Sequence, residues 1–129
     1  MSVEKRVTAF LDLAVQDLDA AELLARAGNR YAAYHVQQAV EKMIKAILVE
    51  RGIPAGREHR IEVLLEELPV TDAAQSRFEP WVGYSVFATS FRYPSPGGKP
   101  APAPASSKVL QDVRDLRVIE AELRERLTS

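Results

Sequence analysis

Apolar positions recur along the chain at helical spacing, in runs separated by glycine and proline. The first run extends from Val3 to about Gly28 and places its apolar residues on one helix face, namely Val7, Phe10, Leu11, Ala14, Leu18, Ala21 and Ala25. A second run from Tyr31 to Arg51 directs another set inward, namely Val36, Ala39, Val40, Met43, Ile44, Ile47 and Leu48. Gly28 and Gly52 follow the two runs, and glycine there is a typical left-handed helix stop. Two long helices are therefore predicted.

Shorter segments follow. Apolar spacing predicts a short third helix that Pro69 closes, with Ile61, Leu64, Leu65 and Leu68 inside. Thr71 or Asp72 is suited to cap the next segment. Pro80 lacks a backbone N–H, so we expect a break there or a new first turn at Trp81. The stretch 81–91 can be helical, and its β-branched and aromatic residues leave a strand as the less favoured alternative.

Residues 94–107 hold five of the eight prolines and are expected to form an exposed loop. Ser106 or Ser107 should then cap a last helix. The residues of that helix expected inside are Val109, Val113, Leu116, Ile119, Leu123 and Leu127. Because no convincing strand pair occurs, the predicted fold class is all-α, an antiparallel up-and-down bundle of four to five helices. We expect one domain over residues 1–129.

Composition narrows the classes of function. Hydrophobic residues make up 47% and charged residues 27%, which is typical of a folded domain. The chain has no cysteine and two histidines, so thiol chemistry is excluded and we expect neither a metal site nor a cofactor. Lys and Arg number 17 against 18 acidic residues, which argues against coating nucleic acid by bulk charge. The N-terminus is not signal-like and no membrane-length apolar run occurs, so we expect a cytoplasmic protein that does not engage a membrane.

The second predicted helix carries the most informative polar residues. At 100° per residue, one side of it holds His35, Gln38, Lys42 and Lys45. An imidazole, an amide and two ammonium groups suit phosphates or base edges, so this stripe is a candidate nucleotide- or RNA-binding surface. The alternative is a buried histidine bonded to a neighbouring helix, together with solvated lysines.

Three further sets of residues are candidates for a functional site, each on weaker evidence or outside the second helix. Arg30 and His35 are the residue types that metal-independent RNA cleavage needs, yet on one helix they diverge by about 140°. His59 could bind a ligand or pack where the third helix begins. Arg92 and Tyr93 could clamp a phosphate and stack a base, or anchor a helix end on the bundle.

The order of these motifs resembles the HEPN domain family. The resemblance rests on Asp17-Leu-Asp-Ala-Ala21, on Tyr31-Ala-Ala-Tyr-His35 continuing into Gln38-Ala-Val-Glu-Lys42 and Lys45-Ala46, then on His59 with Leu64-Leu65 and on Arg92-Tyr-Pro94. It implies a small antiparallel helical bundle, usually a homodimer, associated with nucleotide or RNA binding. Many prokaryotic members are paired with a minimal nucleotidyltransferase as toxin and antitoxin. Toxic members are implied to be metal-independent ribonucleases that use an arginine and a histidine four to six residues apart, late in the domain.

The sequence departs from the ribonuclease pattern because no histidine follows His59. We therefore expect a homodimeric nucleotide- or RNA-binding module that is the partner of a nucleotidyltransferase. Apolar residues outside the main stripe of the first helix, Leu13, Val15 and Leu23, favour dimerisation. Two alternatives stay open. One is a ribonuclease toxin that uses His35 with Arg30 or Arg92, and the other is a non-enzymatic adaptor that binds protein through the Pro-rich loop.

Overall fold

The computed structural model describes residues 2–89, 94, 96–99 and 102–129. Within them lie five α-helices, α1 (Val3–Arg26), α2 (Ala32–Glu50), α3 (Ile61–Glu66), α4 (Ala73–Phe78) and α5 (Ser106–Thr128), and one 3-10 helix, η1 (Glu79–Ala88). The described part of the chain contains no strand, which confirms the all-α prediction. The strand alternative for residues 81–91 is wrong as far as Ala88, and Phe91 lies outside the described residues.

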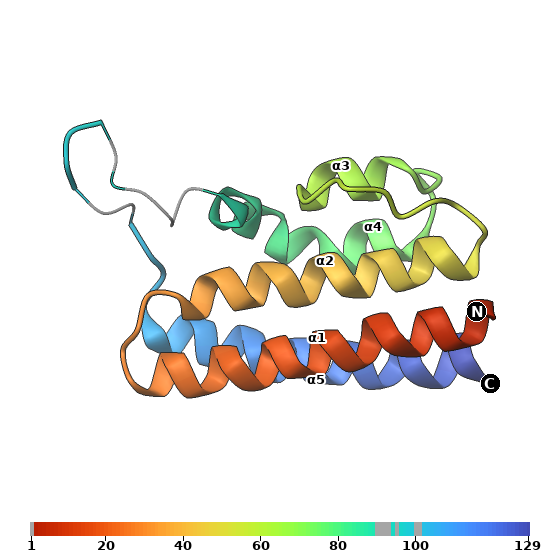
Figure 1. Cartoon of the computed structure of the whole chain (residues 1–129), viewed down its shortest axis with the longest axis horizontal. Coiled ribbons are helices and arrows are strands. Elements are labelled where there is room, and N and C mark those ends of the chain that lie inside the picture. Colours follow the sequence, from red (N-terminus) through yellow and green to blue (C-terminus); the bar gives the residue numbers. More distant parts are fainter. Residues whose placement is uncertain (1, 90–93, 95, 100–101) are drawn as a thin grey trace.

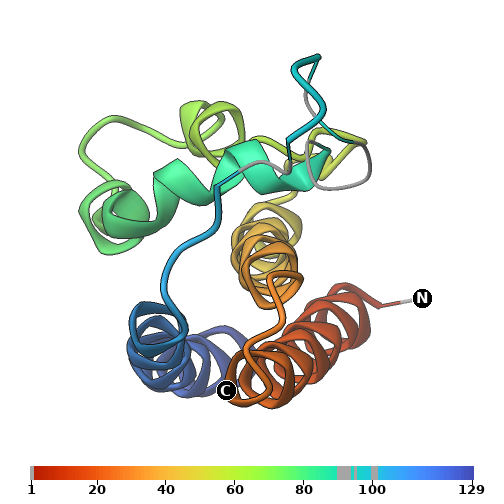
Figure 2. The ribbon, with the colours of Figure 1, turned by 90° about the vertical axis from the view of Figure 1, so that its left-hand side faces the viewer.

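The helices pack around α2. Figure 1 shows α1 running antiparallel to α2 and to α5, with α1 and α5 side by side. Figure 2 shows that α1 and α5 lie on one side of α2, while α3, α4 and η1 cover the other. Because α2 contacts α1, α3, α5 and η1, most of its circumference is enclosed. A helix enclosed in this way must find protein partners for any polar group that it carries inward.

The predicted core positions of the two long helices are confirmed. The seven residues predicted to lie inside α2 are all buried, as are those of α1 apart from the partly buried Phe10. Both helices end as the sequence indicates, because Gly28 and Gly52 adopt positive φ angles of 68° and 75°. Apolar spacing therefore gave the orientation of both helices correctly.

Boundaries in the second half follow local backbone chemistry. Asp72 caps α4 by accepting a hydrogen bond from the backbone N–H of Ala74 at 2.9 Å, as predicted. The break at Pro80 is also confirmed, because α4 ends at Phe78 and the chain continues as η1.

The predicted cap of α5 at Ser106 or Ser107 is wrong. Ala105 is the N-cap, with ψ of 147°, and no side chain caps this end. Because the extended backbone persists one residue beyond Pro104, both serines already lie in the first helical turn. The described residues between 94 and 105 form no regular helix and are mostly exposed, in keeping with the predicted loop, which ends at 105.

A buried polar contact ties η1 to α5. The Tyr84 hydroxyl donates to Asp112, which also accepts a hydrogen bond from Lys108 Nζ at 2.6 Å. Burial and the Asp112 carboxylate raise the pKa of Tyr84 well above its usual range, so the hydroxyl remains a donor. None of the helices in the described part is long and apolar enough to cross a membrane.

The cap of α4 gives a pH-dependent prediction. The hydrogen bond from Ala74, aided by Arg51, holds the pKa of Asp72 below its usual value. The resulting stabilisation is present above the ordinary carboxyl pKa of about 3.9 and is lost as the pH falls through the lower folded value. Asp72→Ala should lower the free energy of unfolding at pH 7 by about 1 kcal/mol. Urea denaturation at a series of pH values measures this loss.

Two further variants distinguish the contribution of the capping hydrogen bond from that of the Asp72 charge. Asp72→Asn retains the capping oxygen and should lose less at pH 7 than the alanine variant does. Glu125→Gln removes an exposed carboxylate of α5 and serves as the control. A loss in Asp72→Ala that stays unchanged down to pH 2 would contradict the assigned role of the carboxylate.

Candidate functional site

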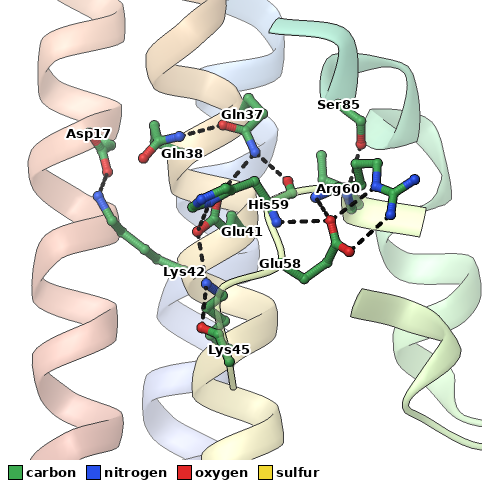
Figure 3. Close-up of polar contacts among 12 residues, drawn as sticks. Asp17, Gln37, Gln38, Glu41, Lys42, Lys45, Glu58, His59, Arg60 and Ser85 are labelled. Atoms are coloured by element: carbon green, nitrogen blue, oxygen red, sulfur yellow. Dashed lines mark hydrogen bonds and ion pairs between the residues drawn. The ribbon is translucent and has the colours of Figure 1, made fainter. Parts of the chain in front are cut away.

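The predicted polar stripe of α2 divides between two neighbours (Figure 3). Lys42 reaches Asp17 of α1, whereas Lys45 reaches the loop that precedes α3. His35 also lies against Asp17. The stripe is therefore two polar clusters that connect α2 to other parts of the chain. We name them the Asp17 cluster, which is Asp17, His35 and Lys42, and the Glu41 cluster, which is Gln37, Glu41, Lys45 and His59.

In the Asp17 cluster one carboxylate takes two partners. Asp17 Oδ1 lies 3.0 Å from His35 Nδ1, and Asp17 Oδ2 accepts a hydrogen bond from Lys42 Nζ. Because an ionised carboxylate is only an acceptor, Nδ1 of His35 carries the hydrogen. In the neutral ring the other nitrogen, Nε2, then has a lone pair; it has no protein partner among the described residues, and the side chain is 30% exposed. The ring is held in place with one nitrogen open to a ligand.

The Glu41 cluster is buried more deeply. Glu41 is 5% and Lys45 6% exposed, and Lys45 Nζ lies 3.0 Å from Glu41 Oε2. Lys45 also donates to the backbone carbonyl of Gly56, and His59 Nδ1 lies 3.1 Å from Glu41 Oε1. Gln37 Nε2 donates to the His59 carbonyl at 2.7 Å. These bonds fix the loop before α3 on the surface of α2 (Figure 3).

Charge is balanced within both clusters. Each contains one carboxylate and one lysine, and buried charges are stable only when paired in this way. The alternative of solvated lysines is therefore wrong for Lys45, because its ammonium group is buried against Glu41. Lys42 is partly exposed but is likewise paired. Neither lysine is an unpaired cation for a phosphate.

The remaining polar residues of this region lie at its exposed edge. Gln38 is partly buried and donates to Gln37 Oε1 at 2.6 Å, which leaves its own carbonyl oxygen unpartnered within the described part. The His59 side chain is 56% exposed and borders a cavity of about 530 Å³ between the loop and η1. Arg60 at this cavity donates to Glu58 and lowers the pKa of that carboxyl to about 2. Arg60 is thus another paired cation.

The other predicted site residues do not join these clusters in the described structure. Arg30 precedes α2 and lines a small cavity with residues from the start of α5. Because it lies before the first helical turn, the divergence of about 140° expected for one continuous helix does not apply to it. Arg92 and Tyr93 lie outside the described residues. Among the described residues no group of three or more acidic or histidine side chains is placed to hold a metal ion.

Asp17, Gln37 and Glu41 are the site residues that were not predicted from the sequence. Glu41 stands four residues before Lys45, which is a favourable spacing for a helical ion pair, within a run of otherwise mostly apolar inward positions. Asp17 adjoins Leu18 on the inward side of α1 and is buried beside it. An acidic residue at an inward-facing helix position indicates a buried ion pair. Asp17 and Glu41 are such residues, and they are the partners of His35 and His59.

Removal of the buried ammonium group gives a test of this arrangement. Lys45→Ala leaves the Glu41 carboxylate buried with only uncharged or exposed partners, so the free energy of unfolding should fall by about 3–5 kcal/mol. Chemical denaturation measures the change. The exposed lysine of α1 provides the control, and Lys5→Ala should change stability by about 0.5 kcal/mol or less. If Lys45→Ala behaves like Lys5→Ala, the pair is not buried as described.

Comparison with known families agrees with the resemblance seen in the motifs. The family model of the HEPN domain matches residues 7–102, which include both clusters. Comparison with curated proteins gives no match, and comparison with solved structures gives none either. The matched region covers well over half of the chain and extends from the first turns of α1 past the end of η1. The chain belongs to the HEPN domain family.

Proposed function

We propose that this chain is a HEPN-family module that binds a nucleotide or single-stranded RNA along the exposed edge of α2. The observation that carries the proposal is the geometry of His35, whose Nδ1 is held by Asp17 while Nε2 has no protein partner. An imidazole fixed in this way presents an acceptor in one orientation, as recognition of a base edge requires.

Neighbouring residues support recognition of a base. Tyr31, His35 and Gln38 follow one another at spacings of four and three residues and therefore share one side of the helix start. Tyr31 is 44% exposed, and the Gln38 carbonyl offers a second acceptor. Stacking together with a few hydrogen bonds to base edges is the usual basis of single-strand recognition.

The paired lysines determine how strongly binding should depend on salt. With Lys42 and Lys45 neutralised by Asp17 and Glu41, few counterions are released from phosphate at this surface. Binding should therefore weaken only shallowly with salt, unless Arg92 contributes. In the proposal Arg92 and Tyr93 remain candidates for a phosphate clamp and a stacking surface, and Arg30 and His59 remain weaker candidates.

We further propose a cytoplasmic homodimer that acts with a nucleotidyltransferase in a system of the toxin and antitoxin type. Family membership supports the pairing. The exposed apolar residues Leu13 and Leu23 of α1 support self-association, because they lie outside the intramolecular core.

Binding by variants tests the proposal. A fluorescently labelled 12-residue single-stranded RNA of mixed sequence and adenosine monophosphate are the probes, with anisotropy and competition as the readouts. His35→Ala should weaken binding about tenfold, since a hydrogen bond is lost, and Gln38→Ala should weaken it by a smaller factor. Gln111→Ala removes an exposed glutamine of α5 and should bind like the parent. Absence of binding by the parent, or equal binding by His35→Ala at unchanged melting temperature, would contradict the proposal.

The Asp17 and His35 pair also favours a second candidate, a metal-independent ribonuclease. A carboxylate at Nδ1 with Nε2 open is the arrangement by which an imidazole becomes a general base. Incubation of the same RNA in excess chelator distinguishes the two functions. Cleavage that disappears in His35→Gln would favour the enzyme, and intact RNA that stays bound would favour the binding module.

A further inference from the structure

A cavity of about 250 Å³ lies between α4 and α5, away from both polar clusters. Figure 2 shows α4 in the group of helices on one side of α2 and α5 in the group on the other, and α2 contributes Ile47 to the lining. The apolar part of the lining comes from three helices and consists mainly of buried side chains, namely Ile47, Ala74, Phe78, Ile119 and Leu123. The rest of the lining consists of Ala73 and three charged residues, Arg77, Glu122 and Arg126. A site with an apolar floor and a few charged groups is typical of small-molecule binding.

The volume limits the size of an occupant. An apolar cavity of about 150 Å³ in another protein holds benzene. Drug-sized ligands occupy pockets of about 300 Å³ or more. A cavity between these limits suits one ring or a short branched chain with a single polar group. Ile47 and Phe78, each 1% exposed, lie at the floor of the cavity.

The charged residues select the sign of the polar group. Arg77 of α4 pairs with Glu122 of α5, so these two charges offset each other. Arg126 lines the same cavity and makes no hydrogen bond or ion pair with the described residues. Arg126 also acts electrostatically on Asp72, whose principal partners are Ala74 and Arg51. One positive charge is therefore left over at the cavity, which favours an anion.

We propose that the cavity between α4 and α5 binds a small organic carboxylic acid. Its ring or short branched chain packs on Ile47, Phe78 and Leu123, and its carboxylate pairs with Arg126. The guanidinium suits this group because its fork of N–H donors matches two carboxylate oxygens. The site is separate from the α2 edge and does not depend on the function proposed for it.

A matched series of probes tests the chemical class. Benzoate, benzyl alcohol and benzylamine share one ring and differ in the charge of the attached group. Titration calorimetry of the full chain should show saturable binding of benzoate, about tenfold weaker binding of the alcohol, and the weakest binding by the amine. No saturable binding of benzoate, or equal affinity for all three compounds, would overturn the proposal.

Variants then place the ligand in the cavity. Arg126→Gln should weaken benzoate binding about tenfold, whereas Glu122→Gln should strengthen it because Arg77 is released. Arg114→Gln removes an exposed arginine of α5 that does not line the cavity, and its affinity should equal that of the parent. Ala74→Leu fills the space and should abolish binding, with circular dichroism to confirm the fold. Benzoate binding that is unchanged in both Arg126→Gln and Glu122→Gln would contradict the site.

Discussion

The carboxylate of Glu41 is almost completely buried on α2, and its charge has to be balanced inside the protein. Lys45 supplies the balancing charge, and His59 and Gln37 occupy the remaining positions around the carboxylate. Because His59 and the Gly56 carbonyl belong to the loop after α2, satisfying this charge also fixes the loop. The start of α3, which follows directly, is positioned by the same bonds. Asp17 has the equivalent role between α1 and α2 through His35 and Lys42.

This balance determines which groups remain for a ligand. Lys42 and Lys45 are paired with carboxylates. Each histidine contacts its carboxylate through Nδ1, and its Nε2 atom makes no hydrogen bond within the described part of the chain. Lys42 and Lys45, which suggest a phosphate site when the helix is viewed alone, therefore stabilise the fold. The Nε2 atoms of His35 and His59 are the groups that stay available to a ligand. A ligand at the α2 edge would be recognised by hydrogen bonds of defined direction more than by charge.

The long helices could be predicted because a helix needs one apolar face and the spacing reports that face directly. The burial of Lys45 could not, because it depends on Gly56 and on the loop that covers α2, which periodicity does not specify. The same holds for Lys42, whose partner Asp17 is 25 residues away on another helix. The cap of α5 was misplaced for a local reason. Serine is a favoured cap in general, but the backbone is still extended at Ala105 and becomes helical at Ser106. Ala105 is therefore the N-cap.

The cavity between α4 and α5 is related to the short length of α4. Pro80 ends α4 after six residues, so α4 packs mainly against η1, and η1 in turn packs on α2. Apolar side chains from both sides line the space that is left. No pattern within a single helix could have indicated it.

The central claim is that carboxylates hold both histidines through Nδ1 and leave Nε2 as the open nitrogen. Long-range ¹H–¹⁵N correlation spectra of the imidazole rings, recorded at a pH of about 8 where an unperturbed histidine is neutral, report the tautomer directly. The account predicts that His35 and His59 both carry their hydrogen on Nδ1, and that Asp17→Asn alters the ¹⁵N shifts of His35 while leaving those of His59 in place. Spectra of the Nε2–H tautomer for both rings in the parent protein would contradict it.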